Sequence, residues 1–181
     1  MNGSFEMTAS EIFEAVTGSG SSDFATLVAI LSRRGAWCLI GGLAVNCYVE
    51  PVYTLDADIV VAASELSAIK DDLIQAGFSV EEFPHLLNAT MPKSDLRIQF
   101  TLDSRYQDFV NDTKVHEVLG QQVPVASLEN IVAGKIWAWS DEKRRLSKRK
   151  KDELDLIRIA EAYTDFREMM PEQIKRQLEQ S

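Results

Sequence analysis

Residues 37–63 read WCLIGGLAVNCYVEPVYTLDADIVVAA and contain the pattern that decides the fold. Hydrophobic spacing predicts four elements in turn: a short buried strand over 37–40, a turn at Gly41 and Gly42, a helix over 43–49, and, after a loop at Pro51, a second strand over 55–62. Because side chains alternate along a strand, Asp56 and Asp58 point to one face, about 6.6 Å apart along the chain. Two carboxylates so close disfavour each other's ionised form, so the pair predicts a site for a divalent cation.

The composition indicates one compact domain. The chain has 181 residues, 45% of them hydrophobic, which is enough for one core but short for two. No apolar run approaches the roughly 18 residues that a membrane span needs, and the acidic N-terminus does not resemble a presequence. Cys38 and Cys47 are too few for a disulfide framework or a zinc site, so we expect a cytoplasmic protein without a membrane partner.

The periodicity predicts an α/β (α+β) fold in which a small mixed sheet is flanked by helices. Polar alternation marks a further strand over 95–101, where Arg97 and Gln99 share one face and Leu96 and Ile98 the other. The predicted parts are an N-terminal helix with a linker over 1–21, a mixed core over 22–126 and a helical part over 127–181. The helical part comprises helices over 127–140, 151–163 and 171–178.

One strongly basic stretch interrupts an acidic chain. Residues 143–151, KRRLSKRKK, which we call the basic segment, hold seven of the 19 Lys and Arg residues, although the net charge is −9. The segment is predicted to join two helices. It is either a solvated turn or a surface for phosphates, such as those of RNA.

The glycine turn and the paired carboxylates together are a more specific signal of phosphate binding than either is alone. Glycines between a strand and a helix let a ligand approach backbone N–H groups, and such a turn alone is a weak signal. Here Gly42 is followed, fourteen residues on, by the first carboxylate of Thr54-x-Asp56-x-Asp58. Backbone amides that hold a triphosphate beside carboxylates that hold its metal ions are the parts that phosphoryl transfer needs.

Four motifs resemble a known family: GGLAVN at 41–46, TLDAD at 54–58, LENIVAGK at 128–135 and KDELD at 151–155. The chain looks like the nucleotidyltransferase superfamily related to DNA polymerase beta, in particular its bacterial branch of AbiEii-type abortive-infection toxins. The resemblance covers roughly residues 35–163.

The resemblance implies transfer of a nucleoside monophosphate from an NTP to an acceptor, in a toxin–antitoxin or phage-defence system with an antitoxin-like partner. It implies that Asp56 and Asp58 are catalytic and hold Mg²⁺ or Mn²⁺. The implied nucleotide-binding residues are Gly41, Gly42, Thr54, Lys135 and Lys151. A second layer of residues that orients them is expected to comprise Arg97, Gln99, Asp152 and Asp155.

Two positions depart from the family pattern. Val52 stands where the family often has arginine, and Gln99 stands where many active members carry a third carboxylate. A glutamine cannot deprotonate an attacking hydroxyl. Asp95 or Asp103 could supply the missing third carboxylate, although both lie far from Gln99 along the strand. The sequence therefore leaves three functions open. They are an Mg²⁺-dependent nucleotidyltransferase, a catalytically impaired nucleotide- or RNA-binding protein of the same fold, and a toxin-like partner protein in a two-gene module.

Lys135 lies on the inward stripe of its predicted helix, three, four and seven residues after Val132, Ile131 and Leu128. An unpaired lysine is strongly disfavoured there, so it requires an anion. That anion is either a carboxylate of the protein, Asp152 or Asp155, or a substrate phosphate.

Overall fold

The computed structural model describes residues 13–14 and 17–180, in which a seven-stranded mixed sheet has the order β3-β4-β5-β2-β1-β7-β6. The strands are β1 (Trp37–Ile40), β2 (Asp56–Val61), β3 (Ser79–Phe83), β4 (Leu86–Thr90), β5 (Arg97–Thr101), β6 (Thr113–Val118) and β7 (Gln121–Ala126). The N-terminal helix predicted from the sequence lies largely outside the described residues.

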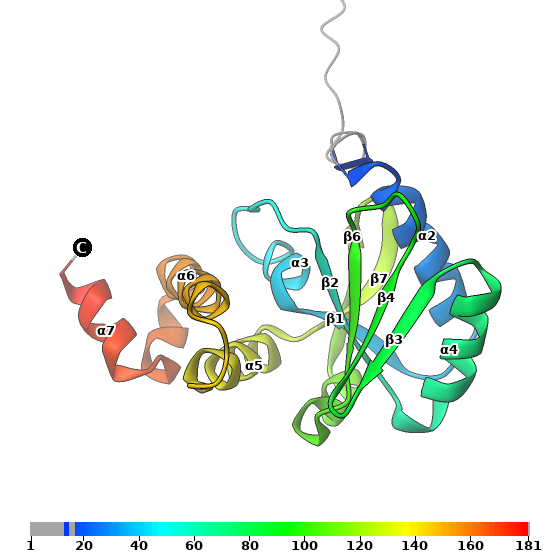
Figure 1. Cartoon of the computed structure of the whole chain (residues 1–181). Coiled ribbons are helices and arrows are strands. Elements are labelled where there is room, and N and C mark those ends of the chain that lie inside the picture. Colours follow the sequence, from blue (N-terminus) through cyan, green and yellow to red (C-terminus); the bar gives the residue numbers. More distant parts are fainter. Residues whose placement is uncertain (1–12, 15–16, 181) are drawn as a thin grey trace, which may run out of the picture.

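Helices cover the two sides of the sheet. They are α2 (Gly20–Leu31), α3 (Gly41–Val45), α4 (Leu66–Gln75), α5 (Leu128–Ser140), α6 (Leu146–Ala162) and α7 (Glu172–Glu179), with 3-10 turns η1 (Ala63–Glu65), η2 (Ser104–Asn111) and η3 (Thr164–Met169). Figure 1 shows α2 and α4 on one side of the sheet and α5, α6 and α7 grouped on the other. No helix in the described part of the chain is long and apolar enough to cross a membrane.

The apolar residues of the central strands are buried, as the sequence pattern predicts. All four residues of β1 are buried, and on β5 Ile98 and Phe100 point into the core while the polar residues between them are exposed or half-buried. β2 pairs antiparallel with β1 and parallel with β5. The predicted strand over 37–40, the mixed sheet and the polar face of β5 are therefore confirmed.

Three helices have bounds that differ clearly from the prediction. Gly20 already belongs to α2, which begins after Ser19 rather than after a linker. α3 begins at Gly41 itself and ends at Val45, so both ends differ from the predicted 43–49. α6 begins at Leu146, so the second half of the basic segment is helical instead of forming a turn. The last error arose because Leu146 is 68% exposed and the following residues are nearly all charged, which leaves no apolar period to mark the helix start.

Candidate active site

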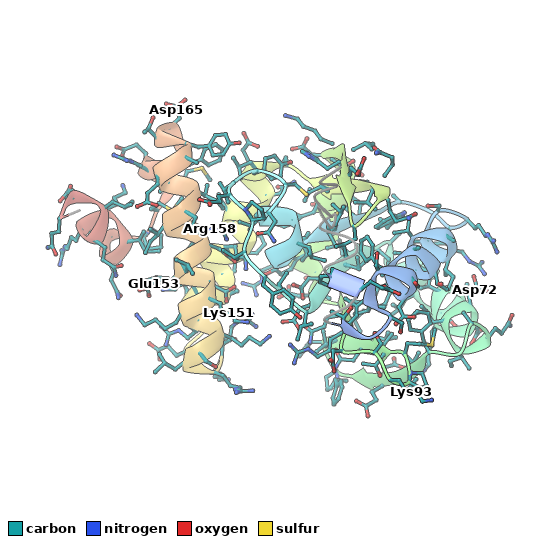
Figure 2. The ribbon with its side chains drawn as sticks, turned by 90° about the horizontal axis from the view of Figure 1, so that it is seen from above. Asp72, Lys93, Lys151, Glu153, Arg158 and Asp165 are labelled. Carbon is teal, nitrogen blue, oxygen red and sulfur yellow. The ribbon has the colours of Figure 1, made fainter. Side chains whose placement is uncertain are left out.

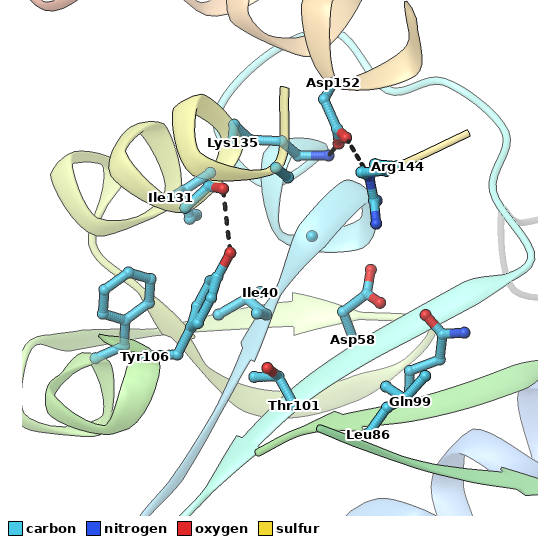
Figure 3. Close-up of a pocket in the computed structure, with 14 residues that line it drawn as sticks. Ile40, Asp58, Leu86, Gln99, Thr101, Tyr106, Ile131, Lys135, Arg144 and Asp152 are labelled. Carbon is cyan, nitrogen blue, oxygen red and sulfur yellow. Dashed lines mark hydrogen bonds and ion pairs between the residues drawn. The ribbon is translucent and has the colours of Figure 1, made fainter. Parts of the chain in front are cut away.

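The paired carboxylates lie where three strands meet the glycine turn. Asp58 pairs with Ile40 at the end of β1, and on its other side it pairs with Gln99 of β5. Gln99 therefore lies next to Asp58 on the polar face, as predicted, and Figure 3 shows both side chains at the floor of one pocket.

Gly41 makes the close approach between the turn and Asp58 possible. Its φ is +70°, a conformation that other residues rarely adopt. A Cβ atom at this position would lie 2.0 Å from Oδ2 of Asp58, so any side chain would displace the carboxylate. The glycine thus brings the backbone of the turn against the acidic pair.

Asp56 is 8% exposed and lies between two cations. Lys148 Nζ donates to its Oδ2 over 2.7 Å, and Arg97 Nε lies 2.7 Å from its Oδ1. The arginine contact is an ion pair without hydrogen-bond alignment, and among the described residues Oδ1 has no hydrogen-bond partner. Burial alone would raise the pKa of Asp56, but Lys148 and Arg97 together lower it.

Asp58 has the opposite electrostatic balance. Removal of water from its carboxylate raises its pKa to about 6, an effect that Lys135 opposes and the charge of Asp56 reinforces. Within the described residues it takes part in none of the ion pairs that engage its neighbours. Asp58 is thus an acidic group in the pocket that has no ion pair with a cation of the described residues.

Lys135 is held by two carboxylates of α6. Its Nζ lies 2.9 Å from Asp152 Oδ1 and 2.6 Å from Asp155 Oδ2. Burial lowers the pKa of Lys135, but Asp155 and Asp152 outweigh it and raise the pKa above its ordinary value. The protein partner that the sequence left as one of two options is therefore present.

Two arginines complete this network. Arg144 Nε lies 2.9 Å from Asp152, and Arg158 lies 2.8 Å from Asp155. Arg158 also donates to the Glu50 carbonyl and to Asn46, so it ties α6 to the loop after α3. Figure 2 shows Lys151, Glu153 and Arg158 along α6, with Asp72 and Lys93 on the far side of the molecule.

Two adjoining hollows flank Asp58, and both are lined by Asp58, Gln99, Lys135, Arg144 and Asp152. The first extends toward η2 and α5 and includes Gly41. The second, the basic hollow, extends toward α6 and the loop before β2, and its further predicted residues are Gly42, Thr54, Asp56, Lys151 and Asp155. Arg97 lines neither but contacts Asp56.

The predicted site residues thus come together from segments far apart in the chain. Asp95 and Asp103 do not join them, because Asp95 is exposed and Asp103 is bound to Arg105. The sequence reasoning missed Arg144 and Lys148 as individual site residues. The charge of the basic segment was the available signal, but nothing in the sequence indicates that Lys148 meets a carboxylate 92 residues away.

Comparison with known proteins places the chain in a family. The family model "Nucleotidyl transferase AbiEii toxin, Type IV TA system" matches residues 28–181. A comparison with curated protein sequences gave no match.

Solved structures share the fold at low sequence identity. The antibiotic-resistance factor ANT(2'')-Ia has a TM-score of 0.58 at 12% identity, over 84% of this chain and 94% of that one. The lincosamide antibiotic adenylyltransferase LnuA has a TM-score of 0.51 at 15% identity, over 74% and 92%. An antigenic nucleotidyltransferase-like protein from Paracoccidioides brasiliensis has a TM-score of 0.53 at 16% identity, over 79% and 76%. On the match over residues 28–181, this chain belongs to the AbiEii nucleotidyltransferase toxin family.

Proposed function

We propose that the protein transfers a nucleoside monophosphate from an NTP to an acceptor in a metal-dependent reaction. The observation that carries the proposal is the position of Asp56 and Asp58. They adjoin a glycine turn at the edge of a hollow that is also lined by four cations: Lys135, Arg144, Lys148 and Lys151. Cations that line a hollow stabilise the phosphate groups of a triphosphate, and a carboxylate pair in the same place can bind the divalent metal ions that accompany those phosphates.

The donor set fits a hard divalent cation. Within the described residues, the buried Oδ1 of Asp56 has no hydrogen-bond partner and only the Arg97 ion pair, which a metal ion would have to displace, and Asp58 belongs to none of the ion pairs around it. Carboxylate and amide oxygens are the ligands that Mg²⁺ and Mn²⁺ prefer, so Asp56 and Asp58 would hold the ion and Gln99 could add an amide oxygen. When bound, the ion would neutralise phosphate charge and help to align the acceptor hydroxyl.

The remaining roles follow from position. Lys148 and Lys151, at the first turns of α6, face the basic hollow and would bind phosphate oxygens. Lys135 would contribute its charge while Asp152 and Asp155 keep it in place. Thr54 accepts a hydrogen bond from the Asp56 amide and so orients the start of β2.

The acceptor that we favour is RNA, bound along the basic segment beside the pocket. An antitoxin-like protein partner follows from the printed family description, which names a toxin of a toxin–antitoxin system. Both are proposals that binding experiments can test separately from catalysis.

A specific observation favours a second candidate, a nucleotide-binding protein without catalysis. Gln99 lies in register with Asp58 and cannot act as a base, and no three His, Cys, Asp or Glu side chains of the described residues form a group that could hold a metal. Lys148 already neutralises Asp56.

Label transfer distinguishes the two candidates. The protein is incubated with each α-labelled NTP, Mg²⁺ or Mn²⁺ and total RNA, and the label on RNA or protein is measured. An enzyme gives transfer that Asp58→Asn abolishes and that the exposed control Asp165→Asn keeps. Absence of transfer, together with a rise in Tm on adding NTP, identifies the non-catalytic binder, because only ligands of the native state raise Tm. Absence of both overturns the proposed function.

A further inference from the structure

The loop before β2, residues 46–55, supplies one wall of the basic hollow and is only partly held by packing. Val52, Tyr53 and Thr54 of this loop line the hollow. Yet Val52 is 41% exposed and Tyr53 57% exposed, so few apolar contacts fix their position. A loop with so little buried surface opens easily unless polar contacts hold it in one conformation.

The side chain of Asn46, the residue after α3, joins the two ends of this loop. Its Nδ2 donates to the Val52 carbonyl over 2.7 Å, and the Val52 amide donates to its Oδ1 over 3.0 Å. The side-chain amide thus pairs with both backbone groups of one residue, as a neighbouring strand would. Since α3 begins at Gly41, these bonds tie the wall of the hollow to the helix that starts at the glycine turn.

Arg158 connects the same loop to α6. Its Nη1 donates to Asp155 Oδ1 over 2.8 Å, and its Nη2 donates to Asn46 Oδ1 over 3.3 Å and to the Glu50 carbonyl. The Arg158 side chain is only 13% exposed, so water competes little for these bonds. The second oxygen of Asp155, Oδ2, lies 2.6 Å from Nζ of Lys135.

These contacts form one continuous chain from one side of the basic hollow to the other. It runs from Lys135 on α5 through Asp155 and Arg158 on α6 to Asn46 and Val52. Lys135 and Val52, at its two ends, line the hollow, but Arg158 and Asn46 do not. A planar guanidinium can hold a carboxylate, an amide oxygen and a carbonyl in one fixed geometry, which a lysine ammonium on its flexible stem cannot.

We propose that Arg158 and Asn46 are positioning residues for the proposed reaction, which hold the loop at Val52 at a fixed distance from Lys135. The inference rests on the proposed function and adds two residues that themselves contact no substrate. Groups that bind a triphosphate must converge on it, and a displacement of about 1 Å can cost up to about a hundredfold in rate.

The first measurement needs no nucleotide. Amide exchange at Val52 is followed by NMR in wild type, Asn46→Ala and Arg158→Lys. Asn46→Ala removes the acceptor of the Val52 amide directly, whereas Arg158→Lys keeps a cation for Asp155 and loses the second arm of the fork. The printed bonds of Arg158 do not include Val52, so exchange there that is at least about tenfold faster in Arg158→Lys reports transmission through Asn46.

The second measurement is the Kd of NTP, by calorimetry in Mg²⁺. Asn46→Ala and Arg158→Lys should each bind NTP about tenfold more weakly. The double variant should bind no more weakly than the worse single variant, because both changes break one chain of contacts. A role in folding alone would lower the amount of binding-competent protein and leave the Kd of the folded fraction unchanged.

Arg167→Lys is the matched control. Arg167 also donates to a backbone carbonyl, that of Ala160 over 3.0 Å, but lines neither hollow. This variant should change neither the exchange at Val52 nor the Kd of NTP. If Arg158→Lys does not fold, Asn46→Ala still tests the affinity, since the bonds that it removes are confined to the loop and Arg158.

Three results would overturn the inference. Unchanged exchange at Val52 in Arg158→Lys would show that nothing is transmitted to the loop. An unchanged Kd in both single variants would leave Arg158 and Asn46 with a structural role only. Losses of affinity that multiply in the double variant would show that the two residues act separately. If the wild type binds no NTP, the proposed function fails, and the exchange measurement, which does not depend on NTP, distinguishes that failure from the others.

Discussion

Replacing Asp58 by asparagine should stabilise the protein at neutral pH, although the change removes a proposed metal ligand. The pKa of Asp58 is raised to about 6 in the folded protein, chiefly by burial, against an ordinary value near 3.8. Between these values the native state binds more protons than the unfolded state, so stability falls as the pH rises from about 4 to about 6 and stays low above it. Two pKa units correspond to about 3 kcal/mol, which is the upper limit of the gain for Asp58→Asn above pH 7.

Asp56 supplies the matched comparison. Its pKa is lowered by Lys148 and Arg97, so its ionised form stabilises the fold above the ordinary pKa and that contribution is lost as the pH falls below it. Asp56→Asn leaves both cations without their partner and should cost about 1–3 kcal/mol at neutral pH.

The assay is urea unfolding of wild type and both variants at about pH 4 and about pH 8, in a chelator so that no divalent ion contributes. We expect opposite signs at the higher pH, and an Asp58→Asn difference that nearly vanishes at the lower pH, where the wild-type carboxyl is already protonated. If Asp58→Asn lost as much stability as Asp56→Asn at the higher pH, the account of an unpaired, desolvated carboxylate would be wrong.

Three further outcomes are expected. The free energy of unfolding in urea should be at least about 1 kcal/mol lower for Gly41→Ala than for Gly77→Ala. Both glycines have positive φ, but only a Cβ at Gly41 would meet a carboxylate, so equal losses would refute the close approach of the turn to Asp58. Lys148→Met should raise the affinity for Mn²⁺ severalfold, because the ion pair of Lys148 with Asp56, worth about 1 kcal/mol, no longer competes with the metal. A titration followed by electron paramagnetic resonance measures this affinity, and weaker Mn²⁺ binding would contradict the prediction. Three exposed cations of the basic segment have no ion pair within the described part of the chain: Lys143, Arg145 and Lys151. Replacing them with serine should flatten the log–log salt dependence of single-stranded RNA binding, measured by fluorescence anisotropy, by about two units, and an unchanged slope would show that the segment does not bind RNA.

The local alternation of apolar and polar residues was sufficient to predict which way the side chains of the central strands face. The alternation of Leu96, Ile98 and Phe100 determined which way Gln99 faces, and the structure confirms that face. The same reasoning located Lys135 on an inward stripe and required an anion for it, which Asp152 and Asp155 supply. In each case burial of apolar neighbours leaves the polar residue only one direction.

Long-range and charge-rich features could not be predicted in this way. The start of α6 at Leu146 has no side-chain cap, and its first turns carry no apolar periodicity; Lys148 there forms a tertiary ion pair with Asp56. The contact of Lys148 with Asp56 depends on how α6 lies across the sheet, which neither segment encodes alone. Arg144 was recognised only as part of a charged stretch, because a free cation and a paired one look alike in sequence.

Polar contacts attach α6 to the rest of the molecule along its whole length, through Asp152, Asp155 and Arg158 in its middle as well as through residues at its two ends. Lys148 meets Asp56 near its start, and Tyr163, just past its end, donates to the Tyr48 carbonyl over 2.8 Å. A ligand on Asp56 competes with the first attachment only. Ligand binding and docking of the helix start are therefore linked equilibria, and the linkage is reciprocal. A partner protein that pressed the start of α6 onto the sheet would weaken ligand binding by the same free energy with which the ligand weakens that partner's hold, without itself entering the pocket.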